Sequence, residues 1–221
     1  MGIKVIITGI TGMVGEGVLL ECLQNPEVTA VLAVCRKPLD QTHPKLQTFL
    51  APNFLDLDPG SFQLKGYDAC FYCAGVSSNG LLEEEYTRIT FDTTIHFATV
   101  ASQLNPNIVF NFVSGYQTDS SETGKVMWAR VKGRTENALI KMFPKRSFNF
   151  RPALMKPMPG QKHFHGYNLW MHKILYPVLR FVFPACTIQE IAQAMINATT
   201  TGYSKPILEV DDIKRLAALS Q

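Results

Sequence analysis

Residues 4–15 read KVIITGITGMVG, and this stretch decides the fold. Residues 4–8 are a short, β-branched run typical of a buried strand. From about residue 14 to 24, apolar side chains recur at helical spacing until Asn25-Pro26 ends the pattern. Residues 30–35 form a second apolar run. Strand, glycine-rich turn, helix and strand thus follow one another within about thirty residues, as in a parallel crossover unit.

The rest of the chain continues this alternation. We expect further strands at residues 54–57, 69–73, 108–113, 148–151 and 207–210. We expect helices at about 84–103 and 126–142, a helix opened by a capping box at Thr187 and Glu190, and a final helix capped by Asp211 or Asp212. This order implies a parallel sheet covered on both faces, with right-handed crossovers. The sequence therefore predicts one α/β domain over residues 1–221, a Rossmann-type doubly wound sheet with a small, irregular C-terminal portion.

Composition and charge limit the class of protein. The 221 residues are 46% hydrophobic and 18% charged, which suits one domain with a sizeable core. The net charge of +3 is too small to imply a nucleic-acid partner. Nine Lys and Arg residues fall between Lys125 and Lys156, with Glu136 as the one acid. We interpret most of them as a solvated face, while a positive field for a phosphorylated ligand is the alternative.

The cysteines indicate a reducing compartment. There are five, an odd number, and most lie in apolar stretches. No signal peptide is expected before the first strand, so a cytoplasmic protein with reduced thiols is predicted. Cys70 and Cys73 form a C-x-x-C within a strand, where positions i and i+3 point to opposite faces. We therefore assign both to core packing rather than to a redox pair.

The glycine-rich turn predicts a dinucleotide site. Gly9 allows a tight turn, Gly12 lets a diphosphate approach the backbone, and Gly15 lets the helix pack against the sheet. Free N–H groups at the amino end of the helix then face the phosphates. The spacing is G-x-x-G-x-x-G, and its position between a strand and a helix matters more than the glycines themselves. The predicted contacts here are Thr8, Gly9, Thr11, Gly12, Met13, Val14 and Gly15.

The residues after the second strand favour one cofactor. An acid there would bind the ribose 2′-hydroxyl of NAD, but Arg36 and Lys37 are cations that suit a 2′-phosphate. NADP(H) is therefore the predicted cofactor, with NAD as the alternative, and Arg36 as an ordinary surface charge is the competing interpretation. After the expected third strand, Asp56 with Leu57 is placed to meet the adenine. Ala74 and Gly75, after the fourth, leave room for the cofactor.

These features together resemble the short-chain dehydrogenase/reductase superfamily. They are T-G-x-x-G-x-x-G, the basic end of the second strand, C-A-G at Cys73–Gly75, a serine after the fifth strand and a later lysine. Within it, the chain is most similar to atypical members, such as the Tat-interacting-protein-like oxidoreductases and bacterial relatives of the NAD-dependent epimerase/dehydratase group. The resemblance covers nearly the whole chain and is stronger up to about Arg151 than beyond it.

The resemblance implies an active site of Ser, Tyr and Lys. Ser114 matches the serine and Lys132 the lysine, with both also near the cofactor, but Trp128 stands at the tyrosine position. In the family the tyrosine hydroxyl moves a proton, its pKa of about 10 being lowered by the lysine ammonium. An indole N–H does not titrate in this range. Lys132 keeps the family's ribose-binding role, and Tyr116 is the candidate replacement for the missing tyrosine.

The last third of the chain carries no motif that identifies a substrate. We expect residues 155–186 to cover the substrate site. Residues 167–183 are apolar but too interrupted to span a bilayer, and packing beside the sheet is favoured over an interfacial membrane helix. A metal site at His163, His165 and His172 is disfavoured because no carboxylate or thiol has ligand spacing beside them. The sequence is compatible both with a monomer and with a homodimer that pairs through the helices expected at 84–103 and 126–142.

Three functions follow from the sequence. The first is an NADP(H)-dependent oxidoreductase acting on an unknown small molecule. The second is a non-enzymatic protein whose partner contacts change with NADP(H) occupancy. The third is a sugar-nucleotide epimerase or dehydratase-like enzyme. Trp128 favours the second function, while Ser114 and Lys132 favour the first.

Overall fold

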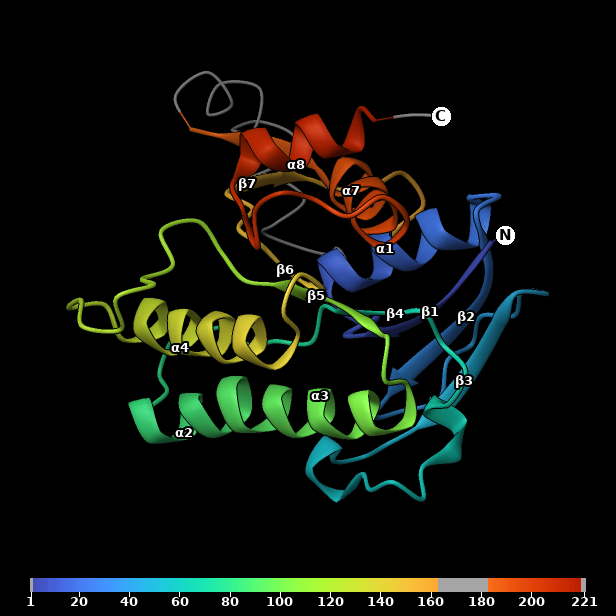
Figure 1. Ribbon diagram of the computed structural model, residues 1–221, viewed down its shortest axis with the longest axis horizontal. Helices are drawn as coiled ribbons and strands as arrows, with labels where there is room; N and C mark the ends of the chain where they lie inside the picture. The colour runs from blue at the N-terminus through green and yellow to red at the C-terminus, as the bar shows by residue number, and fades with distance from the viewer. Residues whose placement is uncertain (1, 163–182, 220–221) are drawn as a thin grey trace.

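The computed structural model describes residues 2–162 and 183–219, and its core is a parallel sheet between two helical layers (Figure 1). The strand order is β3-β2-β1-β4-β5-β6-β9. Every adjacent pair is parallel. The bounds are β1 (Ile3–Thr8), β2 (Val28–Cys35), β3 (Leu46–Leu50), β4 (Ala69–Tyr72), β5 (Val109–Val113), β6 (Ser147–Phe150) and β9 (Ile207–Leu208). The sheet is doubly wound, with its switch point between β1 and β4.

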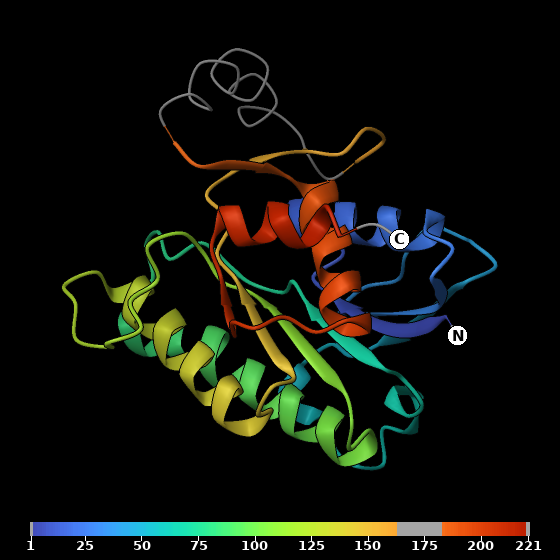
Figure 2. The same ribbon diagram turned by 45° about the horizontal axis from the view of Figure 1, so that its top comes forward.

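Helices cover the sheet on both faces (Figure 2). One layer holds α1 (Met13–Gln24), α7 (Ile188–Thr200) and α8 (Val210–Ala217). The other holds α2 (Glu83–Thr87), the π-helix η3 (Arg88–Asp92), α3 (Thr93–Leu104) and α4 (Met127–Met142). Each layer encloses a hydrophobic cluster against the sheet. A separate pair of parallel strands, β7 (Leu154–Lys156) and β8 (Ala185–Thr187), lies beyond the first layer.

The prediction of a third strand at residues 54–57 is wrong, and this changes which residues line the candidate site. The strand is β3, whereas residues 54–56 form the short 3-10 helix η1 (Phe54–Asp56). Asn53 caps η1 by accepting a hydrogen bond from the Leu55 N–H. Phe54 and Leu57 are buried from this turn, which explains their apolar character without a strand. At the sheet edge, β3 is only half-buried, so its sequence pattern is weak.

Some of the predicted helix features are confirmed and others are wrong. The capping box is confirmed: Thr187 Oγ1 accepts from Glu190 N at 3.0 Å, and Glu190 Oε2 accepts from Thr187 N at 2.6 Å. The expected cap of the last helix is wrong, because Glu209 occupies the N-cap position. Asp211 and Asp212 lie in the first turn of α8 instead, where the helix dipole stabilises a negative charge. The helix expected at 84–103 is interrupted by η3.

The cysteine prediction is confirmed by the two cores. Cys70 lies in the cluster beneath α3, and Cys73 packs against the cluster on the other face. All five thiols are unpaired. In the part of the chain that the structure describes, no helix is long and apolar enough to cross a bilayer. Of the apolar segment at 167–183, all but Phe183 lies outside the described residues.

Candidate functional site

A cavity of about 890 Å³ opens at the carboxyl ends of β1, β2 and β4. In a doubly wound sheet this is where ligands bind, because the loops diverge at the switch point. The wall contains seven of the predicted cofactor contacts: Gly9, Thr11, Gly12, Arg36, Lys37, Ala74 and Gly75. Thr8 at the end of β1, and Met13, Val14 and Gly15 at the start of α1, flank this turn but do not line the cavity.

The turn between β1 and α1 depends on close backbone approaches. Gly9 has φ +69°, and a Cβ there would lie 2.5 Å from the backbone of Cys73 and Ala74. A Cβ at Gly15 would lie 2.2 Å from the Gly9 carbonyl oxygen. Thr8 Oγ1 accepts a hydrogen bond from Ala74 N at 3.1 Å and ties the two strand ends together. The predicted glycine roles at positions 9 and 15 thus correspond to contacts that any side chain would disrupt.

The amino end of α1 is open toward the cavity. Gly12 is its N-cap residue and provides no side chain to cap the first N–H groups. Such groups, together with the helix dipole, favour an anion. At the same edge of the cavity, Arg36 and Lys37 are exposed after β2. The cavity therefore combines a backbone anion site with a pair of cations.

The adenine-side residues differ from those expected. Asn53 and Phe54 line the cavity, whereas Asp56 and Leu57 are outside its wall. Asp56 Oδ1 accepts from Asn53 Nδ2 at 2.9 Å, and the Leu57 carbonyl is hydrogen-bonded to His96 at 2.7 Å. The misplaced strand caused this difference, because β3 ends earlier in the chain than expected. The run LQTFL at 46–50 gives only a weak strand signal, because apolar and polar residues do not alternate along it.

Ser114 and Lys132 are brought together at the carboxyl end of β5. Lys132 Nζ donates to the Ser114 carbonyl oxygen at 2.8 Å. The Ser114 hydroxyl is hydrogen-bonded to Thr118 Oγ1 at 2.9 Å. Tyr116 follows with its side chain exposed, and its N–H donates to the Pro152 carbonyl. These residues lie outside the wall of the cavity beside α1, toward β5 and α4.

Trp128 and Lys132 share one face of α4. A Cβ at Gly115 would lie 3.8 Å from Trp128 Cζ3 and 3.9 Å from Lys132 Nζ. Both side chains therefore reach the space in front of Gly115, as i, i+4 spacing on a helix allows. Burial lowers the pKa of the Lys132 ammonium to about 8, although the Glu136 carboxylate one turn further along opposes this shift.

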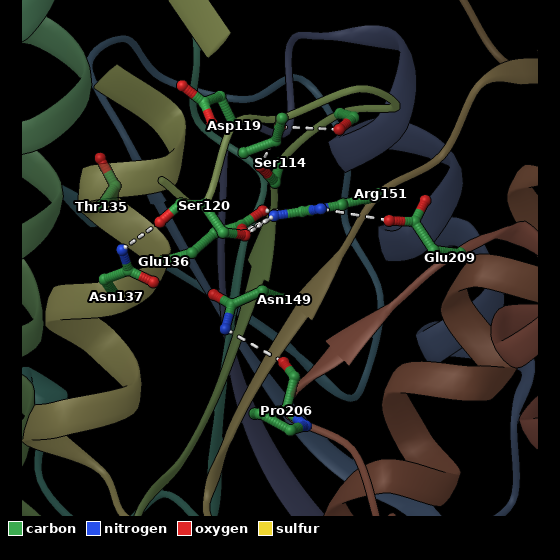
Figure 3. A network of polar contacts seen from close by, with 12 residues as sticks. Ser114, Asp119, Ser120, Thr135, Glu136, Asn137, Asn149, Arg151, Pro206 and Glu209 are labelled. Carbon is green, nitrogen blue, oxygen red and sulfur yellow. Dashed lines mark hydrogen bonds and ion pairs between the residues drawn. The ribbon is translucent and has the colours of Figure 1, made fainter. Parts of the chain in front are cut away.

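A buried ion-pair network supports this end of α4, and sequence reasoning missed it. Arg151, after β6, contacts both carboxylate oxygens of Glu136, at 3.0 and 2.5 Å (Figure 3). It also donates to Ser120 Oγ at 2.6 Å and to Glu209 at 3.2 Å. Burial raises the pKa of Glu136, whose side chain is fully buried, while Arg151 opposes the rise. The only sequence signal for this network was the position of Glu136, four residues after Lys132 in the expected helix.

The segment after β7 is attached to the phosphate turn. Gln161 Nε2 donates to the Met13 carbonyl at 2.6 Å, and Gln161 Oε1 accepts from Met158 N at 2.6 Å. The Lys162 N–H donates to Glu16 Oε1 at 2.5 Å. The described start of the predicted 155–186 cover therefore contacts the amino end of α1.

A reactive thiol and a bound metal ion are two other chemistries that the site residues could suggest. Cys73 lines the cavity, but burial raises the pKa of its thiol to about 12, so it stays protonated at neutral pH. Within residues 2–162 and 183–219, no three His, Cys, Asp or Glu side chains are grouped to hold a metal ion. The three histidines considered from the sequence lie outside these residues.

Comparison with solved structures identifies the architecture. A UDP-N-acetylglucosamine 4-epimerase from Methanobrevibacter ruminantium, solved with UDP-N-acetylmuramic acid, superposes with a TM-score of 0.69 at 18% identity. The match covers 94% of this chain and 76% of that one. The chain has a Rossmann fold. WbmF of Bordetella bronchiseptica, solved with NAD⁺, gives a TM-score of 0.66 at 13% identity over 98% and 76% of the two chains.

Further matches come from fungal proteins. The PhqB reductase domain of Penicillium fellutanum gives a TM-score of 0.66 at 14% identity, over 96% of this chain and 67% of that one. In sequence, the leucinostatins biosynthesis cluster protein T of Purpureocillium lilacinum is 25% identical over 231 residues. That alignment covers 86% of this chain and 82% of that protein. No family model matches the chain.

Proposed function

We propose that this protein is an atypical member of the short-chain dehydrogenase/reductase superfamily that binds NADP(H) and reduces or oxidises a small molecule. The observation that carries the proposal is the cavity at the switch point. It joins the uncapped amino end of α1 to the cations Arg36 and Lys37. An NAD⁺-bound neighbour and a reductase domain with the same fold support this reading. The likeness to Tat-interacting-protein-like oxidoreductases remains part of the proposal.

The residues present fit the cofactor. The amino end of α1, which has no side-chain cap at Gly12, offers backbone N–H groups, and this suits a diphosphate. Arg36 and Lys37 would hold the 2′-phosphate, since charged donors form the stronger hydrogen bonds to phosphate. Asn53 would contact the adenine in place of Asp56.

The chemistry is divided between cofactor and chain. When bound, NADPH supplies a hydride to an electrophilic carbon of the substrate. The chain must then bind the substrate oxygen and exchange a proton with it. We assign this task to Ser114 and Lys132, and the support is that the two residues are adjacent at the end of β5.

Calorimetric titration with NADPH and NADH tests the binding proposal. We expect wild type to bind NADPH more tightly. We expect Arg36→Asp to weaken NADPH binding by about 10- to 100-fold, the loss of one or two charged hydrogen bonds. NADH binding should strengthen, because an acid at this position can accept a hydrogen bond from the ribose 2′-hydroxyl. Lys141→Asp, an exposed charge on α4, is the matched control and should leave both affinities unchanged. A wild-type preference for NADH would contradict the role of Arg36, and no binding of either at millimolar concentration would overturn the proposal.

Trp128 favours a second candidate, a protein that binds NADP(H) without catalysis. Its indole cannot exchange a proton, and it occupies the position of the family's tyrosine. Turnover of aldehydes, quinones and UDP-sugars by wild type and Trp128→Tyr separates the candidates. Activity found only in the variant would support the non-catalytic function, and activity with UDP-sugars would support the epimerase alternative.

A further inference from the structure

The end of β5 lacks the family's proton donor, yet it holds another titratable group. Trp128 and Lys132 both reach the space in front of Gly115, and the indole N–H does not titrate near neutral pH. Tyr116, the alternative donor, has an exposed side chain after this point. Lys132 Nζ is a proton-bearing group that contacts the end of β5 directly, through the Ser114 carbonyl.

The position of Lys132 is set by several contacts. Its Nζ donates to the Ser114 carbonyl oxygen at 2.8 Å, which uses one of three N–H donors. The Ser114 hydroxyl, which stands beside it in the family's site, is engaged with Thr118 at 2.9 Å. Gly115 contributes no side chain, and both Trp128 Cζ3 and Lys132 Nζ lie within 4 Å of the position that its Cβ would occupy.

We propose that Lys132 itself exchanges the proton with the substrate oxygen, and that Trp128 forms an apolar wall beside it. This inference rests on the proposed oxidoreductase function and concerns which residue completes that reaction. In the reductive direction a proton leaves Lys132 Nζ for the substrate oxygen, while the neighbouring carbon receives the hydride from NADPH. A carbonyl becomes an alcohol, NADPH becomes NADP⁺, and the neutral amine regains its proton from water.

The charges around Lys132 support this role. Burial lowers its pKa to about 8, so the ammonium is a usable acid near neutral pH. Glu136 is the nearby carboxylate that raises it. That carboxylate is held by two contacts with Arg151, which follows β6, and Arg151 also pairs with Glu209 at the start of α8. The opposed charges limit how far Glu136 restores the ordinary lysine pKa.

The first experiment measures the protonation of Lys132 without relying on turnover. NMR titration of wild type carrying ¹³C,¹⁵N-lysine, with Lys132→Arg for assignment, should show one ammonium titrating near pH 8. Glu136→Gln should move the Lys132 transition to lower pH, because it removes the negative charge that favours the ammonium. A Lys132 that titrates above pH 10 in both free and NADP⁺-bound protein would overturn the proposal.

The second experiment separates proton transfer from cofactor binding. Arginine keeps the charge and donors of Lys132 but does not release a proton near neutral pH. We expect Lys132→Arg to bind NADPH within about threefold of wild type and to lose roughly 10²- to 10⁴-fold in turnover, the usual contribution of a general acid. Lys141→Arg on the same helix is the matched control. For wild type, kcat/KM for reduction should fall above about pH 8, as the ammonium deprotonates.

The outcomes distinguish this inference from the proposed function. Failure to bind NADPH would reject both. Binding and turnover that survive in Lys132→Arg but disappear in Tyr116→Phe would assign the proton to Tyr116 and reject only the inference. If Lys132→Arg does not fold, the shift of the transition near pH 8 in Glu136→Gln assigns that transition to Lys132, and the wild-type titration and pH profile then decide the question.

Discussion

Gly9→Ala should show how much the cavity depends on a backbone contact between β1 and β4. Two penalties add at this position. The φ of +69° costs an L-residue about 1–2 kcal/mol, partly offset by a stiffer unfolded chain. The new Cβ would also lie 2.5 Å from the backbone of Cys73 and Ala74, and overpacking of this kind costs about 1–3 kcal/mol. We expect a loss of about 2–4 kcal/mol in the free energy of unfolding and at least tenfold weaker NADPH binding.

Two matched glycines separate these penalties. Gly66 has φ +88° with nothing within 4 Å of an added Cβ, so Gly66→Ala should lose only about 1 kcal/mol. Gly75 is also open and lacks the positive φ, so Gly75→Ala should change stability by less than about 0.5 kcal/mol. Urea unfolding followed by circular dichroism measures all three. If Gly9→Ala loses no more than Gly66→Ala, the close approach of β1 and β4 is not what requires glycine.

Two further predictions concern buried charge. Arg151→Met leaves the Glu136 carboxylate buried without its partner and should lower the unfolding free energy by about 3–5 kcal/mol. Arg130→Met, which removes the more exposed pair with Glu83, should cost less than about 1 kcal/mol; equal losses in urea unfolding would contradict the importance of burial. Lys132 has a pKa of about 8 when folded and 10.5 unfolded, so the unfolded chain binds more protons between these values. Wild type should therefore gain stability relative to Lys132→Met between pH 8 and 10.5, by at most roughly 3 kcal/mol, when the unfolding free energies of the two proteins are compared in parallel urea titrations.

Local patterns in the sequence were sufficient for much of the fold. The β-branched run at β1, the glycine turn and the periodic pattern of α1 each reflect contacts within a few residues of one another. The capping box at Thr187 and Glu190 is equally local, and it was found where expected. Edge strand β3 was missed because its half-exposed side chains need not be apolar. Because of that single error, Asp56 was expected at the cavity, whereas Asn53 lines it.

The sequence by itself determined the α/β alternation and the place of the phosphate turn, because both depend on backbone geometry and periodicity over short stretches. Only the tertiary structure decided that Asn53 faces the cavity, that Arg151 neutralises Glu136, and that Lys132 lies desolvated at the end of β5. Those properties arise between side chains far apart in the chain. Burial and charge pairing, unlike helical or strand periodicity, exist only once the layers have packed.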